Sequence, residues 1–311
     1  MKVLKIVFAS FLLLFLTSNS WSQKKFAITI DDIPNTRLYS ENLFQAQLLQ
    51  IINENDIPVT VFINEGLLYK NQYVEENFSL LNQWVKSENV SLGNHTFSHP
   101  WYSETPIDTF MLDVVKGEAI TKELAKVNNK VLKYFRFPFN DLGKDSIQQV
   151  EVQQRLESLG YTIAPFTIES SDWMFNFLYE YYLKEQNKEE ARKIGQAYYH
   201  ITLEAFAYFD SISMVQYDRS IPQIYLCHDN AINTDYLIPI VVELIGQGYE
   251  IINLEEAMKD EVYQQENSYY KKWGISWIYR WMEDKEHRKS VMLNEPDIME
   301  YYQLYEQLSK E

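Results

Sequence analysis

The sequence predicts an α/β fold of parallel strands, arranged either as a barrel or as an open doubly wound sheet. Short runs rich in β-branched and aromatic residues recur along the chain, and each ends in polar residues. Most of these runs are separated by stretches whose apolar residues lie three and four positions apart, as on one face of a helix. Strands that alternate with helices are joined by right-handed crossovers, so the strands are expected to lie parallel in one sheet.

The expected strands are short and apolar enough to be buried. Glycine precedes two of them, at Gly160 and Gly248, where a helix is expected to end and lead into a strand. We expect strands at Phe26–Ile30, Val59–Ile63, Val90–Leu92, Val131–Phe135, Tyr161–Ile168, Gln223–Cys227 and Tyr249–Asn253.

Helical stretches lie between most of these strands, and two further segments interrupt the alternation. Residues 174–219 are rich in Tyr, Phe, Glu and Lys and predict an inserted pair of helices broken near Asn187. Residues 259–311 predict a mostly helical C-terminal extension, which leaves 23–258 as the main domain. The helices of the main domain are expected at Glu41–Asn53, Phe78–Glu88, Asp108–Val127, Ser146–Leu159 and Tyr236–Gly246.

The composition of the 311-residue chain excludes several classes of protein. With 46% hydrophobic residues and a single cysteine, Cys227, the chain is neither disordered nor held together by internal disulfides. Its 28 Lys and Arg residues against 44 Asp and Glu residues give a net charge of −16, which would repel a phosphate backbone. We therefore expect no nucleic-acid partner. The length suits one main domain with additions.

The first 22 residues have the layout of a secretory signal peptide. Lys2 and Lys5 precede the apolar run Ile6–Leu16, and small and polar residues follow, with cleavage expected after Ser20 or Ser22. A retained membrane anchor is the alternative, but about 11 apolar residues fall short of the roughly 20 that span a bilayer. We expect an exported protein, periplasmic or secreted, with no transmembrane span after cleavage.

Two histidines and two aspartates form a candidate metal site. His95 and His99 follow an expected strand, and their spacing places both imidazoles on one face of a helical turn, where both can bind one ion. Asp31 and Asp32 follow the first strand, where adjacent carboxylates raise one another's pKa unless a cation offsets their charge. Either pair alone is more often structural, so the prediction depends on their occurring together.

Three further strand ends carry polar candidates. Arg136 follows one expected strand, Glu169 and Asp172 with Trp173 follow the next, and His228 follows a third. Each is weak by itself. Because α/β folds place their functional sites at the carboxyl ends of parallel strands, we expect these groups to meet the two acid and histidine pairs at one edge of the sheet.

In this order the polar groups resemble the five motifs of the polysaccharide deacetylase family, the NodB homology domain of carbohydrate esterase family 4. The likeness covers about residues 24–258 and departs from the family at two positions, where Asn140 replaces glycine and Glu169 replaces aspartate. The matching segments are Thr29-Ile30-Asp31-Asp32, His95-Thr96-Phe97-Ser98-His99, Arg136-Phe137-Pro138-Phe139-Asn140, Glu169-Ser170-Ser171-Asp172-Trp173 and Leu226-Cys227-His228.

The resemblance implies a distorted (β/α) barrel that holds one divalent metal ion. The implied ligands are Asp32, His95 and His99. The chemistry of the residues agrees, because two imidazoles and one carboxylate leave open positions for water and substrate. Zinc is the expected ion, with cobalt or nickel as alternatives.

The resemblance also implies an acid and a base. Asp31 would be the general base that takes a proton from water, oriented by Arg136. His228 would be the acid that protonates the leaving amine. A carboxylate of the fourth motif would orient His228, and the sequence leaves open whether Glu169 or Asp172 does so.

Apolar and aromatic residues complete the expected site. The resemblance implies that the backbone N–H of Phe139 binds the oxyanion, and that Trp173 and Leu226 line the pocket for the acetyl methyl group. The aromatic insertion and extension could stack on sugar rings or simply pack on the barrel, and the segment Tyr279–Trp281 is the first candidate for stacking.

The expected activity is removal of N-acetyl groups from an exported carbohydrate, such as chitin oligomers, peptidoglycan or another amino-sugar polymer. Two alternatives remain. The same machinery could cleave O-acetyl esters, as relatives do on xylan, or the chain could be a carbohydrate-binding relative without catalysis. Retention of all the metal-ligand and acid–base candidates argues against the last.

Overall fold

The computed structural model describes residues 23–310, and the predicted signal peptide, residues 1–22, lies outside the described residues. Within this range eight strands form one sheet, in which every pairing is parallel. The strands are β1 (Lys24–Ile33), β2 (Val59–Ile63), β3 (Val90–Asn94), β4 (Leu132–Phe135), β5 (Thr162–Ile163), β6 (Ile168–Glu169), β7 (Gln223–His228) and β8 (Tyr249–Ile251).

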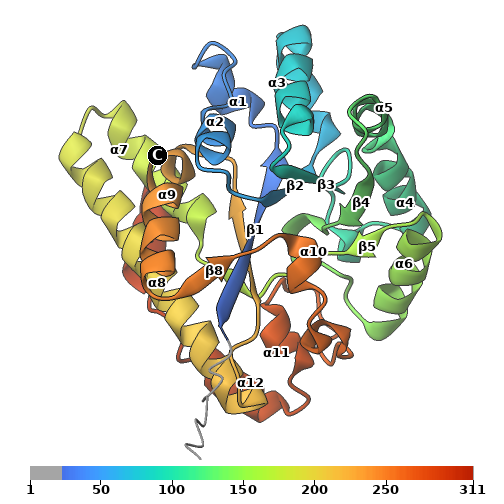
Figure 1. Cartoon of the computed structure of the whole chain (residues 1–311), viewed down its shortest axis with the longest axis vertical. Helices are drawn as coiled ribbons and strands as arrows, with labels where there is room; N and C mark the ends of the chain where they lie inside the picture. The colour runs from blue at the N-terminus through green and yellow to red at the C-terminus, as the bar shows by residue number, and fades with distance from the viewer. Residues whose placement is uncertain (1–22, 311) are drawn as a thin grey trace, which may run out of the picture.

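The sheet curls into an open half-barrel with helices around it (Figure 1), which confirms the predicted fold class. Its strand order is β5-β4-β3-β2-β1-β7-β6, and β8 pairs with the first residues of β1. Strands β5 and β6 therefore lie at opposite ends of the sheet although they are neighbours in the sequence. The carboxyl ends of β1, β3, β4 and β7 meet along one edge.

The prediction of a single strand at Tyr161–Ile168 is wrong, because two short strands, β5 and β6, occupy that stretch. Pro165 lies between them, and proline has no N–H to donate to a sheet ladder. Two carbonyls of the intervening turn accept hydrogen bonds from the C-terminal extension instead. Trp277 N–H donates to the Phe166 carbonyl at 3.0 Å, and the Ser276 hydroxyl donates to the Thr167 carbonyl at 2.6 Å.

The helices of the main domain lie close to the predicted positions. The helix expected at Asp108–Val127 is instead two helices that meet near Gly117, where a Cβ atom would lie 2.4 Å from the carbonyl carbon of Thr96. The helices are α1 (Thr36–Ser40), α2 (Gln47–Glu54), α3 (Val74–Lys86), α4 (Ile107–Lys116), α5 (Ala119–Val127), α6 (Ser146–Ser158), α9 (Ala231–Gly246) and α10 (Leu254–Ala257).

The stretch predicted to be an insertion contains two helices, α7 (Asp172–Lys184) and α8 (Lys188–Tyr217). They are separated near Asn187, as expected, and its side chain caps α8 by accepting a hydrogen bond from Glu190 N–H at 3.2 Å. Helix α8 packs against α7 and α9 on one side of the molecule (Figure 1).

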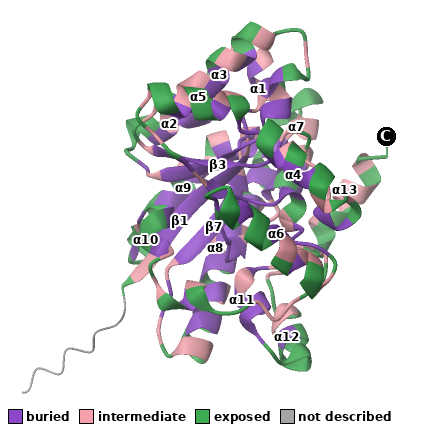
Figure 2. Cartoon of the chain, turned by 90° about the vertical axis from the view of Figure 1, so that its right-hand side faces the viewer, coloured by how far each residue is buried: buried purple, intermediate pink, exposed green. Residues whose placement is uncertain are grey.

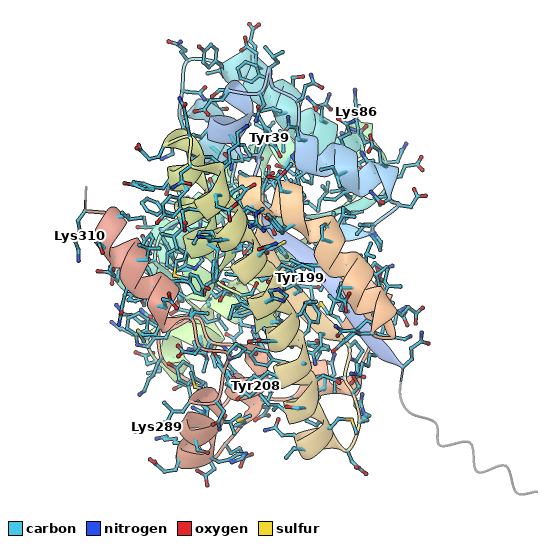
Figure 3. All side chains as sticks on the ribbon, turned by 90° about the vertical axis from the view of Figure 1, so that its left-hand side faces the viewer. Tyr39, Lys86, Tyr199, Tyr208, Lys289 and Lys310 are labelled. Carbon is cyan, nitrogen blue, oxygen red and sulfur yellow. The ribbon has the colours of Figure 1, made fainter. Side chains whose placement is uncertain are left out.

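The C-terminal stretch contains α11 (Trp277–Trp281), α12 (Lys285–Met292) and α13 (Met299–Leu308). Helix α13, which ends beside Lys310 in Figure 3, packs on α7. The rings of Tyr301 and Phe175 lie 4.9 Å apart at this contact. The boundaries 23–258 and 259–311 remain predictions.

The buried residues concentrate on the strands, whereas the outer sides of the helices are exposed (Figure 2). Strand β2 is buried along its whole length, as its apolar sequence predicts. Among the described residues, no helix is both long enough and apolar enough to cross a membrane.

Candidate active site

An irregularity in β1 positions the two aspartates. Pairing with β2 runs from Ile30 opposite Val61 to Ile33 opposite Ile63, so β1 contains one extra residue between these points. The extra length falls at Asp31 and Asp32, and Asp32 has a positive φ of 59°. As a result Asp31 is buried within the sheet edge, whereas the Asp32 side chain is 40% exposed.

The His95–His99 segment is a loop, so the expected helical turn is wrong. Its backbone has positive φ at Thr96 and His99. Polar side chains hold this conformation: the Asp113 carboxylate accepts hydrogen bonds from the N–H groups of Phe97 and Ser98 at 3.0 and 2.9 Å. The loop still brings the two imidazoles together, with ring centroids 4.9 Å apart.

Asp32, His95 and His99 form a cluster that fits a divalent metal ion. Their ligand atoms lie within 4.8 Å of one another. The Asp32 carboxylate is 3.8 Å from Nε2 of His95 and 3.6 Å from Nε2 of His99. An ion about 2.0–2.1 Å from each ligand in tetrahedral geometry places the ligands about 3.4 Å apart, close to these separations.

His95 is held in the form that a metal ligand requires. Its Nδ1 lies 2.8 Å from the Arg136 carbonyl, an acceptor that keeps the proton on Nδ1 and leaves the Nε2 lone pair facing Asp32. Burial, together with the neighbouring His99, lowers the pKa of His95 to about 3. The ring is therefore neutral near pH 7 and able to bind a cation.

Arg136 lies buried beside Asp31, as predicted. Its Nη1 is 3.5 Å from the Asp31 carboxylate, and its Nη2 donates to the Thr29 hydroxyl and the Pro165 carbonyl, each at 3.1 Å. Burial raises the pKa of Asp31, and the opposing charge of Arg136 offsets only part of that effect. Asp31 is also the direct strand neighbour of His228.

Asp172, and not Glu169, contacts His228. The Asp172 carboxylate accepts hydrogen bonds from Nδ1 and from the backbone N–H of His228, both at 2.7 Å. Burial alone would lower the pKa of His228, but the carboxylate outweighs it and raises that pKa to about 10. Asn230 and Asn233 also donate to Asp172, at 2.9 and 2.7 Å. Neither asparagine was predicted to belong to the site, because its only signal in the sequence is an N-cap pattern before α9.

The Glu169 carboxylate stabilises the backbone turn that follows it. Its carboxylate accepts a hydrogen bond from Ser171 N–H at 2.6 Å, and Ser171 has a positive φ of 54°. Burial and the nearby Asp172 charge raise the pKa of Glu169 to about 7. The replacement of aspartate by glutamate at this position thus leaves the contact between Asp172 and His228 intact.

A pocket of about 510 Å³ opens beside these groups. Asp32, His99, His228 and Trp173 all line it, and the Trp173 ring is 46% exposed. Leu226 is buried in β7 and is not among the described residues that line this pocket, so its place in an acyl site remains a prediction.

Phe139 contacts His99 but is not among the described residues that line this pocket. Its backbone has a positive φ of 56°, and its ring centroid lies 4.4 Å from that of His99. The side chain is 42% exposed. The assignment of its N–H to an oxyanion remains a prediction.

The segment Tyr279–Trp281 does not form an exposed stacking surface, and that hypothesis is wrong. Its three side chains are buried. Arg280 donates hydrogen bonds to four main-chain carbonyls, so this segment organises the extension from within. The acceptors are the carbonyls of Tyr269, Ile275, Trp273 and Asn140.

Two histidines of the chain lie outside the site. His200 and His287 are both exposed, on α8 and α12, as expected for solvated residues. Cys227 is buried next to His228 and pairs across the sheet with Ile30.

Comparison with known proteins finds similarity to one family. Residues 18–164 match the family model for polysaccharide deacetylase. The chain is 23% identical over 156 residues to the peptidoglycan-N-acetylglucosamine deacetylase of Bacillus cereus, a match that covers 50% of this chain and 49% of that protein. It is also 23% identical over 234 residues to the chitin deacetylase of Colletotrichum lindemuthianum, covering 75% of this chain and 79% of that one.

A solved structure shows the same fold. A mutant of a CE4 family pseudoenzyme from Bacillus anthracis superposes with a TM-score of 0.50 and 19% identity, covering 77% of this chain and 68% of the other. The chain thus spans about half the length of the Bacillus cereus relative and about two thirds of the pseudoenzyme. These matches confirm the predicted resemblance to the polysaccharide deacetylase family, whose model matches residues 18–164.

Proposed function

We propose that this protein is a metal-dependent hydrolase that removes N-acetyl groups from an exported carbohydrate. One observation carries the proposal: the cluster of Asp32, His95 and His99 lies at the same sheet edge as a buried base candidate, Asp31, and an acid candidate, His228. Relatives named as deacetylases of peptidoglycan N-acetylglucosamine and of chitin support an amino-sugar substrate. Export rests on the signal-peptide pattern of residues 1–22.

The donor set of the cluster suits a divalent ion, with zinc as the first choice and cobalt or nickel as alternatives. When bound by Asp32, His95 and His99, such an ion would supply Lewis acidity toward the acetyl carbonyl and lower the pKa of a water molecule. The hydrogen bond from His95 Nδ1 to the Arg136 carbonyl orients one ligand in advance.

Asp31 is the proposed general base. Its raised pKa makes it a better proton acceptor than an exposed aspartate, and its burial separates it from competing water. Arg136, at 3.5 Å, keeps the carboxylate ionised and holds its orientation. The guanidinium is itself fixed by Thr29 and the Pro165 carbonyl, so the pair is rigid.

His228 is the proposed general acid. Because Nδ1 donates to Asp172, Nε2 is the atom left to deliver a proton to the leaving amine. The raised pKa of His228 keeps the ring protonated at neutral pH before transfer. The leaving amine of an amide requires this proton, whereas the alkoxide of an ester requires it less, so an O-acetyl esterase would depend less on His228.

Trp173 and Phe139 are proposed to shape the substrate site. The half-exposed Trp173 ring lines the pocket beside His228 and forms an apolar wall for the methyl group of the acetyl substituent. The loop bearing Phe139 would contribute a backbone N–H to the developing oxyanion.

Acetate release tests this function directly. The protein should release acetate from N-acetylglucosamine oligomers or peptidoglycan fragments, and a chelator should abolish the release. Asp31→Asn should keep its metal, measured by elemental analysis, and lose about 10²–10⁴-fold in rate, whereas His95→Ala should lose both metal and activity. If the protein releases acetate only from O-acetylated xylan, it is an esterase. If the metal-loaded protein releases no acetate from any acetylated sugar, only the carbohydrate-binding alternative remains.

A further inference from the structure

A row of aromatic side chains leads away from the proposed metal site toward the C-terminal extension. The ring of Phe139 contacts His99 on one side, and Trp101 stacks on Phe139 with centroids 3.9 Å apart and ring planes only 3° from parallel. Lys272 of the extension follows, with its ammonium 5.7 Å from the Trp101 ring centroid and 5.1 Å from that of Trp273. We call Phe139, Trp101 and Trp273 the aromatic strip.

The outer end of the strip is open to solvent. Trp273 is 59% exposed and Phe139 is 42% exposed, so apolar ring surface faces water beside the candidate catalytic groups. The Lys272 ammonium also lies 3.3 Å from the Glu104 carboxylate. The aromatic strip thus offers exposed rings, and Lys272 and Glu104 beside it offer a hydrogen-bond donor and an acceptor. A sugar ring with apolar faces and hydroxyl edges can use this combination.

The position of Trp273 is fixed from beneath. Arg280, buried under the segment, donates to the Trp273 carbonyl at 3.0 Å and to the Asn140 carbonyl at 3.5 Å. The backbone of Gly274 approaches the same loop so closely that a Cβ atom there would lie 2.4 Å from the carbonyl oxygen of Phe139. The backbone at Trp273 is thus held against the loop that follows Arg136, although it comes from a different part of the chain.

We propose that Trp273, together with Trp101 and Lys272, binds a second pyranose ring of the glycan, next to the sugar whose acetyl group reaches the site at His99. This inference rests on the proposed deacetylase function and assigns residues of the C-terminal extension to the binding of a second sugar. His99 lines the pocket and also contacts the strip, so one glycan can extend from the strip across His99 into the pocket.

Binding is measured separately from turnover. The experiment titrates the Asp31→Asn protein with the N-acetylglucosamine pentamer and with the single sugar by calorimetry, with and without Trp273→Ala. Loss of one ring stacking contact should weaken pentamer binding about 2- to 12-fold and shrink the advantage of the pentamer over the single sugar. Trp273→Phe should restore most of the affinity. Tyr199→Ala, on α8 (Figure 3), is the control and should leave both affinities unchanged.

The outcomes separate this inference from the proposed function. If Trp273→Ala binds the pentamer as tightly as the parent protein does, or if the parent protein does not bind the pentamer, the assignment of the strip is wrong. If pentamer binding depends on Trp273 but the wild-type protein releases no acetate, the proposed function fails and the glycan-binding strip stands. Thermal unfolding of Trp273→Ala should match the parent because the side chain is mostly exposed.

Discussion

Replacement of Asp172 by asparagine provides the sharpest test of the acid–base assignment. The Asp172 carboxylate accepts four hydrogen bonds. Two come from Nδ1 and the backbone N–H of His228, and two come from the side-chain amides of Asn230 and Asn233. An asparagine whose oxygen keeps the three contacts made by Oδ2 must turn its amino group toward His228 Nδ1. Imidazolium has a proton on that nitrogen, so the variant disfavours the charged ring.

The expected loss follows from the pKa of His228. That pKa is raised to about 10 beside Asp172. Without the carboxylate, the pKa of His228 should fall to its ordinary value near 6.5 or below it. At pH 8 a group with a pKa of 6.5 is only about 3% protonated, a loss of about 30-fold in the acid form. Loss of orientation adds to this, up to the 10²–10⁴-fold typical of a general acid.

The assay is the pH dependence of kcat/KM for acetate release from an N-acetylglucosamine oligomer. In Asp172→Asn the alkaline limb should move to lower pH, while metal content stays equal to wild type. Glu169→Gln is the matched control, because Glu169 belongs to the same segment but its carboxylate contacts Ser171 N–H. A wild-type alkaline limb in Asp172→Asn, or a greater loss in Glu169→Gln, would refute the assignment.

Two further predictions concern stability. Burial raises the pKa of Asp229 from 3.8 to about 7 despite hydrogen bonds from Tyr39 and Asn35, so the folded protein binds the extra proton and stability falls as pH rises from about 4 to 7. Asp229→Asn should flatten that fall, measured by urea unfolding of metal-free protein at pH 5 and pH 8; an unchanged slope would contradict the prediction. Gly274→Ala places a Cβ atom 2.4 Å from a carbonyl oxygen and should cost about 1–3 kcal/mol, whereas Gly246→Ala, with no atom within 4 Å of the new Cβ, should be neutral or stabilising in the same unfolding assay.

The sequence was sufficient to predict most of the sheet because its strands are buried on both faces. Strand β2 is apolar throughout and was predicted with the bounds Val59–Ile63 that the structure has. The rule that sites form at the carboxyl ends of parallel strands also predicts that Asp31, Arg136 and His228 lie close together. Strand order and edge pairing depend on contacts between distant segments, which no local pattern contains.

The errors fall where tertiary contacts override local spacing. The spacing of His95 and His99 suits a helical turn, but Asp113 and the Asn94 side chain capture the N–H groups of the loop, and positive φ at two residues then directs both rings inward. The choice between Glu169 and Asp172 could not be made from sequence either, because it depends on the turn at Ser171. Two of the deciding partners are distant in the chain, since Asp113 lies 16 residues from Phe97 and Asp172 lies 56 residues from His228.

The C-terminal extension gives a physical reason for the departure at Asn140. A Cβ atom at Gly274 would lie 2.6 Å from the Cβ of Asn140, so the absence of a side chain at Gly274 provides the space that the asparagine occupies. Gly274 thus leaves room for the Asn140 side chain, at a position where the family motif has glycine. Arg280 donates hydrogen bonds to the carbonyls of both Asn140 and Trp273, and so links the two segments. The loop of the third motif and the extension thus form one packed unit, and changes in either should alter the position of Phe139 beside His99.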